Sequence, residues 1–246
     1  MNLQTVENKG SKPKPLIRLQ EVVKIYNGFA GKVVALDGIT LQVFPGEFLV
    51  VTGRSGSGKT TMVNLLTGLD RMTSGEIWVE DSPMHRFTPE QAAKFRGRKL
   101  GVIFQSFELL PTLTVLQNVM LPMDFSGHYS SLREQRERAL SLLEQVEIAD
   151  HFRKLPAALS GGQQQRLAIA RAMANDPDVL VADEPTGSLD SATANTVVDI
   201  FENLVQQGRT ILLVTHDKDI ARRGSRRITL FDGKLIDDEG QGRSNA

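Results

Sequence analysis

Residues 48–68, FLVVTGRSGSGKTTMVNLLTG, decide the fold. Phe48–Thr52 is a short apolar run, typical of a buried parallel strand, and the residues after Thr60 have the apolar spacing of a helix that ends at Gly68. Between them, Gly53–Thr60 matches the pattern G-x-x-x-x-G-K-[ST], whose glycines let successive backbone N–H groups face one anion. The sequence therefore predicts a strand, a phosphate-binding loop and a helix.

Two side chains of this loop have predicted roles of their own. Lys59 can reach the β and γ phosphates of a nucleotide, and the Thr60 hydroxyl is placed to bind Mg²⁺. The same loop would suit a small-molecule kinase or a GTPase equally well, so it predicts nucleotide binding without fixing the class of enzyme. The candidate nucleotide-binding residues of this segment are Gly53, Arg54, Ser55, Gly56, Ser57, Gly58, Lys59, Thr60 and Thr61.

A second apolar strand is predicted at Val179–Asp183, and it ends in two consecutive carboxylates. Asp183 at the strand end can hold Mg²⁺ through water, and Glu184 can orient and activate the water that attacks a γ-phosphate. An isolated Asp-Glu pair usually marks a solvated loop. After a buried strand, in a chain with a phosphate-binding loop, the pair instead predicts a hydrolytic site.

The remaining pattern predicts one α/β domain over residues 16–237, with a helical lobe inserted at about 106–159. Short β-branched runs and turns before Val51 indicate a mainly antiparallel layer. A helix expected from about Ala192 to Gln206 and a strand at Thr210–Thr215 then restore the alternation of a parallel sheet. We expect residues 1–15 to form a flexible arm and residues 238–246 a flexible tail.

Composition excludes several other classes of protein. The 246 residues carry 29 basic and 29 acidic side chains, so the net charge gives no bulk attraction to nucleic acid or to acidic lipid. Because the chain has no cysteine, disulfides, thiolate metal sites and a cysteine nucleophile are excluded. The longest apolar runs fall far short of the roughly 20 residues that span a bilayer, so we expect no direct membrane insertion.

The segment that narrows the class is Leu159–Gln163, LSGGQ, which resembles the signature sequence of the ATP-binding-cassette (ABC) ATPases. Ser160 suits an N-cap, and the two glycines after it expose backbone N–H groups at a helix start, where phosphate binds. The resemblance extends from about Leu16 to Asp237. It implies the P-loop NTPase fold of this family: an α/β core with a parallel sheet, an N-terminal antiparallel β layer and an inserted α-helical subdomain.

Further positions match the family pattern one by one. The resemblance implies that Gln105 contacts Mg²⁺ and reports the nucleotide state to the helical lobe. It implies that His216 is a catalytic residue, which hydrogen-bonds the γ-phosphate and Glu184. It also implies that Tyr26 stacks on adenine and that Ser188–Asp190 cross a dimer interface. The signature residues that would bind the nucleotide held by a second subunit are Ser160, Gly161, Gly162 and Gln163. The cofactors implied are ATP and Mg²⁺.

Partners follow from the same resemblance. In this family two subunits close head to tail around two ATP molecules, which implies a homodimer on ATP binding that drives a separately encoded integral membrane permease. We therefore expect a cytoplasmic chain, peripheral on the inner face of the cell membrane, with no nucleic-acid partner. The alternative is a soluble ABC ATPase that acts on nucleic acid or ribosomes.

Within the family, segments such as Leu69-Asp70 and Leu109–Val115 resemble the ATPases of lipoprotein release, macrolide export and cell division. This subfamily resemblance implies an exporter or a mechanotransmission system. Ser188 and Glu108 depart from the subfamily pattern, which often has asparagine at these positions. Glu108 lies in the expected docking surface, which consists of Phe104–Val115 and the helical lobe. Its apolar residues either contact a membrane partner or belong to the core of the helical lobe; they are Phe107, Leu109 and Leu110.

Overall fold

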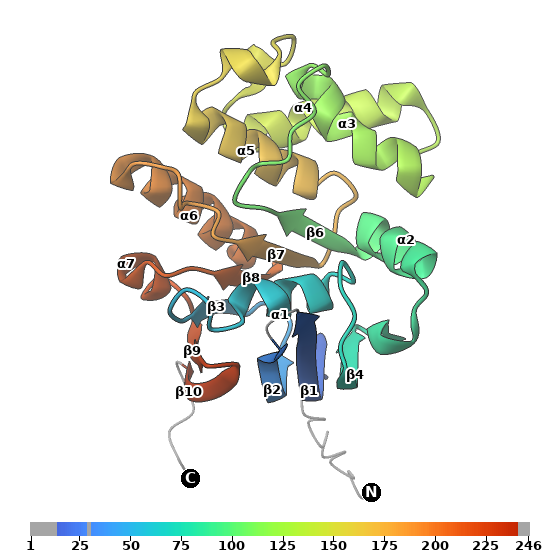
Figure 1. Ribbon diagram of the computed structural model, residues 1–246. Helices are drawn as coiled ribbons and strands as arrows, with labels where there is room; N and C mark the ends of the chain where they lie inside the picture. Colours follow the sequence, from blue (N-terminus) through green and yellow to red (C-terminus); the bar gives the residue numbers. More distant parts are fainter. Residues whose placement is uncertain (1–13, 29–30, 241–246) are drawn as a thin grey trace, which may run out of the picture.

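The computed structural model describes residues 14–28 and 31–240, which form two β-sheets and a helical lobe (Figure 1). The larger sheet has six strands. In spatial order they are β10 (Lys234–Gly240), β9 (Arg226–Phe231), β3 (Phe48–Thr52), β8 (Thr210–Val214), β7 (Val179–Asp183) and β6 (Leu100–Ile103). The strands predicted at Phe48–Thr52 and Val179–Asp183 have the predicted bounds.

Five adjacent strands are parallel, namely β9, β3, β8, β7 and β6, and β10 is antiparallel to β9. Every residue of β7 and β8 is buried, which is why both strands are continuous apolar runs rather than alternating ones. Their register places Val51 beside Val214, and Val214 beside Asp183. The carboxyl ends of β3, β8 and β7 therefore lie next to one another, and the segments that follow them meet at one edge of the sheet.

The smaller sheet is antiparallel, as the sequence predicts for the N-terminal region. Its order is β2 (Gly31–Val43), β1 (Ile17–Gly28), β4 (Ser74–Val79) and β5 (Ser82–Pro83). One hydrophobic core lies between the two sheets and includes the buried face of α1 (Lys59–Leu66), which Figure 1 shows between them. The phosphate-binding loop is thus anchored by a helix packed on both sheets.

The helical lobe connects β6 to the neighbouring strand β7. It contains α3 (Val115–Ser126), α4 (Leu132–Gln145) and α5 (Gly161–Ala172), with short 3-10 helices η2 (Ala149–His151) and η3 (Pro156–Ala158). A second hydrophobic core joins these helices to the sheet and to α6 (Ser191–Gln206). Since buried residues of α5 such as Leu167 and Ile169 belong to this core, the helix that follows the signature sequence packs against both the lobe and the sheet. The remaining helices are η1 (Met84–Arg86), α2 (Pro89–Lys99) and α7 (Lys218–Ala221).

The chain end differs from the sequence prediction. Strand β10 extends to Gly240, so the tail expected from residue 238 begins at least three residues too early. The cause is an ion pair: both carboxylate oxygens of Asp238 accept hydrogen bonds of 2.7 Å from the guanidinium of Arg226, which holds β10 against β9. Residues 241–246, and residues 1–13 of the expected arm, lie outside the described residues.

No helix within residues 14–28 and 31–240 is long and apolar enough to cross a bilayer.

Candidate functional site

The phosphate-binding loop connects the end of β3 to the start of α1. Gly56 and Gly58 have φ of 79° and 102°, in the left-handed region that favours glycine. A side chain at Gly58 would also collide with the carbonyl oxygen of Ala35 on β2. The loop therefore needs glycine both for its curvature and for its close contact with the antiparallel layer.

Lys59 closes this loop on itself. Its ammonium donates to the carbonyl oxygens of Gly53 at 2.9 Å and Arg54 at 3.1 Å, and the residue is only 8% exposed. The hydroxyl of Ser57 is buried and has no hydrogen-bond partner among the described residues. The loop itself thus fixes the positions of the Lys59 ammonium and the Ser57 hydroxyl, two groups that can bind an anion. Arg54, Ser55 and Thr60 are exposed at its surface, and Thr61 is half-buried.

Asp183 lies at the end of β7, where the sequence predicts a metal ligand. The residue is 8% exposed, and its Oδ1 has no hydrogen-bond partner among the described residues. Burial raises the pKa of this carboxyl; a hydrogen bond from Thr60 and the charge of Lys59 oppose that rise, whereas the charge of Glu184 adds to it. An unsatisfied buried carboxylate oxygen next to a threonine hydroxyl is a donor set that suits Mg²⁺. The residues present therefore fit the metal that the resemblance implies.

Glu184 and His216 meet across two neighbouring strands. The backbone N–H of Glu184 donates to the carbonyl oxygen of Val214 at 2.9 Å, although its φ of 47° is unusual for a residue with a side chain. Its Oε2 lies 2.9 Å from Nδ1 of His216 and accepts a longer hydrogen bond of 3.4 Å from the His216 backbone. The strained backbone directs the carboxylate toward the histidine rather than along the strand.

Gln105 follows β6 and is exposed. A Cβ atom added at Gly187 would lie 3.1 Å from its Nε2, so the glutamine reaches the loop that follows Glu184. The structure therefore places Gln105 beside the loop that follows the acidic pair, whereas the sequence relates them only through the order of motifs.

The chain next to Gln105 is attached to the signature helix. Phe107 and Glu108 both have left-handed backbones, with φ of 56° and 50°. The guanidinium of Arg171, on α5, donates to the carbonyl oxygens of both residues. Leu109 packs partly into the lobe core, whereas Leu110 is 41% exposed. Of the two alternatives for these apolar residues, packing in the lobe core therefore accounts for Leu109 but not for Leu110.

The signature residues form the start of α5 in a capping box. The Ser160 hydroxyl accepts from the Gln163 backbone at 3.3 Å, and the Gln163 side chain accepts from the Ser160 backbone at 2.9 Å. A side chain at Gly162 would collide with the methyl group of Thr193 on α6, while Gly161 is exposed. These residues line a groove between α5 and α6 of about 230 Å³.

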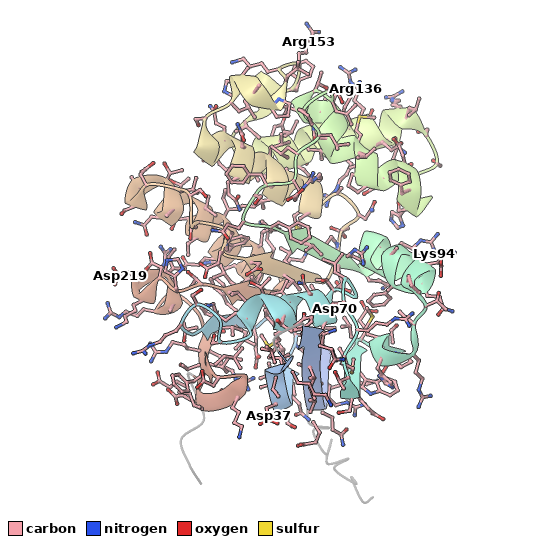
Figure 2. The ribbon with its side chains drawn as sticks, viewed as in Figure 1. Asp37, Asp70, Lys94, Arg136, Arg153 and Asp219 are labelled. Carbon is pink, nitrogen blue, oxygen red and sulfur yellow. The ribbon has the colours of Figure 1, made fainter. Side chains whose placement is uncertain are left out.

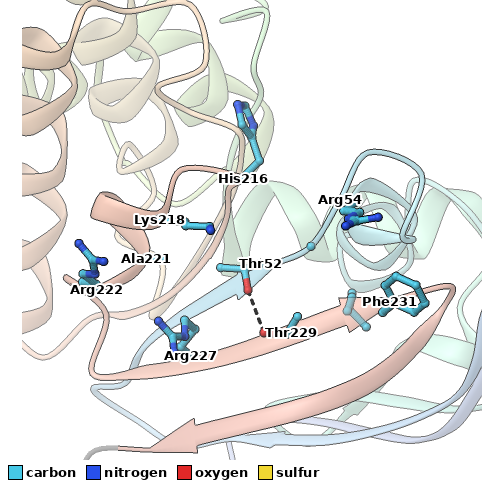
Figure 3. Close-up of a pocket in the computed structure, with 11 residues that line it drawn as sticks. Thr52, Arg54, His216, Lys218, Ala221, Arg222, Arg227, Thr229 and Phe231 are labelled. Atoms are coloured by element: carbon cyan, nitrogen blue, oxygen red, sulfur yellow. Dashed lines mark hydrogen bonds between the residues drawn. The ribbon is translucent and has the colours of Figure 1, made fainter.

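A larger pocket of about 570 Å³ adjoins the phosphate-binding loop. Figure 3 shows Arg54, His216 and Lys218 around it, with Arg222 and Arg227 farther along α7 and β9. Its floor includes Thr52, whose hydroxyl lies 3.1 Å from that of Thr229 (Figure 3). Within the part of the chain that the structure describes, this pocket and the groove at the signature residues share no lining residue, so the two motifs line separate sites.

Tyr26 lies on β1 near the hairpin that joins it to β2. It is 40% exposed, and its hydroxyl donates to Oδ2 of Asp70 at 2.7 Å. The ammonium of Lys24 lies 4.5 Å from the centroid of its ring. Sequence reasoning identified Tyr26 but not Lys24, and it treated Asp70 only as part of a subfamily motif, because nothing in the local pattern links residues so far apart.

The comparisons with known proteins agree with this geometry. A model of the ABC transporter family matches residues 36–187. The lipoprotein-releasing system ATP-binding protein LolD 1 of Chlorobium chlorochromatii is 45% identical over 204 residues, covering 82% of each chain. The macrolide export ATP-binding/permease protein MacB of Syntrophobacter fumaroxidans is 45% identical over 226 residues, covering 92% of this chain but 32% of that protein. This chain therefore spans about a third of the MacB relatives it matches.

A solved structure has the same fold. The dimeric ABC transporter cassette MJ0796, from Methanocaldococcus jannaschii, superposes with a TM-score of 0.85 at 40% identity, covering 91% of this chain and 98% of that one. The same cassette is known as a dimer in a post-hydrolysis state bound to ADP and Pi, again with a TM-score of 0.85. By its sequence, its fold and the arrangement of its loop and signature residues, the chain belongs to the ABC transporter family, as an ATP-binding cassette.

Proposed function

We propose that the chain binds and hydrolyses ATP with Mg²⁺ and that a homodimer of it drives an integral membrane permease. The observation that carries the proposal is the meeting of three segments at one edge of the parallel sheet. The phosphate-binding loop follows β3, the acidic pair follows β7, and His216 follows β8, which lies between them. Ligands of open α/β sheets bind at the carboxyl ends of the strands, as this arrangement requires.

Each group has a part in the proposed hydrolysis. The loop amides and Lys59 bind the triphosphate. Thr60, Asp183 and Gln105 would hold Mg²⁺, which neutralises charge on the β and γ phosphates when bound. Glu184 accepts a proton from water as the water oxygen bonds to the γ phosphorus, and the bond from that phosphorus to the β-phosphate oxygen breaks. His216 keeps the Glu184 carboxylate in position through their 2.9 Å contact.

Dimerisation completes the site in this proposal. The phosphate-binding loop and the signature residues line separate pockets of one chain, so a second copy has to supply the helix start at Ser160. Closure around two ATP molecules then follows from binding, and hydrolysis allows reopening. The dimeric cassette MJ0796 is the relative that supports this arrangement.

The membrane partner is proposed from the relatives. LolD 1 is named for a lipoprotein-releasing system and MacB for macrolide export by an ATP-binding/permease protein. We infer an exporter or mechanotransmission system, with the cassette peripheral on the inner face of the cell membrane. The exposed Leu110, next to the loop held by Arg171, is where a helix of the permease would dock.

Two measurements test the proposal. Lys59→Ala should raise the Kd for ATP at least about tenfold, because a charge-assisted contact to phosphate is lost; unchanged affinity would contradict the role of the loop.

An ATP-trapped Glu184→Gln protein, used as bait on detergent-solubilised membranes, should capture a permease in stoichiometric amount. Recovery of ribosomal or DNA-bound proteins instead would overturn the membrane role but leave the proposed hydrolysis intact.

A further inference from the structure

Asp70 lies just beyond the end of α1 and binds two side chains of β1. Its Oδ1 accepts from the Lys24 ammonium at 2.7 Å and from the Arg71 backbone at 2.6 Å, and its Oδ2 accepts from the Tyr26 hydroxyl at 2.7 Å. The Lys24 ammonium also donates to the Arg71 carbonyl at 2.6 Å. Figure 2 shows Asp70 near α1 and the upper end of β1. One carboxylate thus fixes both the aromatic ring and the cation beside it.

The contact with Lys24 decides which side of the ring a ligand can use. The ammonium lies 4.5 Å from the ring centroid, within the distance of a cation–π contact, and therefore covers one face of Tyr26. Only the opposite face can receive a planar group. Val33 pairs directly with Tyr26 across the hairpin and is 62% exposed, so an exposed apolar side chain lies on the same side of the sheet.

The same carboxylate is tied to the helix of the phosphate-binding loop. The backbone N–H groups of Leu69 and Asp70 both donate to the carbonyl oxygen of Asn64 in α1, at 2.8 Å and 3.1 Å. The helix begins at Lys59, so Asp70 and the phosphate-binding loop lie at the two ends of one short rigid element. The separation between the Tyr26 ring and the loop is consequently set through α1 and not only through the hairpin.

We propose that Asp70 is a positioning residue for the nucleotide base. By holding the Tyr26 hydroxyl, with Lys24 against the ring, it fixes the ring where a purine stacks while the phosphates occupy Gly53–Thr60. The proposal rests on the proposed function, since it requires a nucleotide in that loop. A ring that is already oriented loses less conformational freedom on binding, so the tether increases affinity without touching the ligand.

The tether needs an ionised Asp70 carboxylate and a protonated Tyr26 hydroxyl, and the surroundings favour both states. Burial alone would raise the pKa of Asp70, but hydrogen bonds from Lys24 and Tyr26 outweigh it, and the pKa lies below its ordinary value. Burial, followed by the hydrogen bond to Asp70, raises the pKa of Tyr26, with the Thr61 hydroxyl opposing the rise. The carboxylate therefore remains an acceptor and the phenol remains a donor over the whole neutral range.

The experiment compares two ligands by calorimetry on the full chain. ATP has the base and the phosphates, whereas inorganic tripolyphosphate has only the phosphates. Tyr26→Phe keeps the ring but removes the tether, and Asp70→Asn weakens it from the other side. Each change should raise the Kd for ATP by about threefold to tenfold, as for loss of one net hydrogen bond, and leave the Kd for tripolyphosphate unchanged.

Tyr129→Phe is the matched control, because Tyr129 is the second of the two tyrosines and donates to Ala174 at 2.6 Å in the lobe. It should change neither Kd. The double variant Tyr26→Phe with Asp70→Asn should be little weaker than either single one, since both remove the same contact. Equal weakening of tripolyphosphate and ATP would overturn the inference, because it would mean that the turn after α1 was disturbed.

Tyr26→Ala separates this inference from the proposed function. If Tyr26→Ala leaves the Kd for ATP unchanged, the base does not stack there, and the adenine contact that the family resemblance implies is itself wrong. If Tyr26→Ala weakens ATP binding but Tyr26→Phe does not, the ring matters and the tether does not, which refutes the role of Asp70 alone. Tyr26→Phe shows whether the hydrogen bond to Asp70 contributes to ATP affinity, even if Asp70→Asn fails to fold.

Discussion

Replacing Asp183 by asparagine should stabilise the protein in the absence of nucleotide while removing its hydrolytic activity. The Asp183 carboxylate is 8% exposed, and its Oδ1 has no hydrogen-bond partner among the described residues. An unsatisfied buried polar group costs about 1–3 kcal/mol, more if charged, and an amide of the same shape is cheaper to bury. We expect a gain of about 1–2 kcal/mol, or roughly 2–8 °C in Tm for a domain of this size.

The gain in stability from Asp183→Asn should change with pH in a definite direction. Burial raises the pKa of Asp183 in the folded protein above that in the unfolded chain, so the ionised carboxylate costs stability at neutral pH. The cost decreases as the pH falls through the folded pKa and is absent below the unfolded pKa, where both states are protonated. The advantage of Asp183→Asn should therefore be largest near pH 8 and should disappear below the ordinary carboxyl pKa of 3.8.

Thermal unfolding in EDTA, without nucleotide, measures this effect. Asp124→Asn is the control: Asp124 is exposed on α3, and its substitution should change Tm by no more than about 1–2 °C. A Tm for Asp183→Asn at or below that of the unchanged protein at pH 8 would refute the reasoning. A gain of equal size at pH 8 and below pH 3.8 would refute the assignment of the effect to ionisation.

Two further variants test the chemistry and the coupling. Glu184→Gln should lower kcat by at least about 100-fold, because a general base is lost, and should accumulate as an ATP-dependent dimer in size-exclusion chromatography; turnover near the normal rate would contradict its role. Glu108→Lys should leave basal hydrolysis unchanged and abolish stimulation by the permease in reconstituted vesicles, since Glu108 is exposed in the proposed docking surface. Equal loss of both activities would indicate misfolding instead.

The sequence predicts those parts of the fold that depend on local pattern. Phe48–Thr52 and Val179–Asp183 are strands with the predicted bounds, because a fully buried parallel strand is a continuous apolar run. The capping box at Ser160 is likewise encoded within four residues. The phosphate-binding loop and the acidic pair each follow a predicted strand. If both strands belong to one parallel sheet, the two motifs lie at the same edge of that sheet.

Contacts between distant segments could not be predicted in this way. Tyr26 and Asp70 are brought together by the pairing of β1 with β4, and their hydrogen bond spans 44 positions of the chain. Strand β10 persists to Gly240 because Arg226 binds Asp238, although the tail composition alone indicates no strand. Local pattern contains neither strand order nor such side-chain pairs, and both set the geometry around the site.

The hydrogen bonds from Arg171 to the loop after Gln105 have a consequence for how the proposed docking surface can change during evolution. Arg171 holds the backbone carbonyl oxygens of Phe107 and Glu108, not their side chains. The attachment of this loop to α5 is therefore independent of which residues occupy the two positions, provided that they tolerate a left-handed backbone. If the proposed permease docks there, the side chains at these two positions can differ to suit another membrane partner while the attachment of the loop to α5 stays the same.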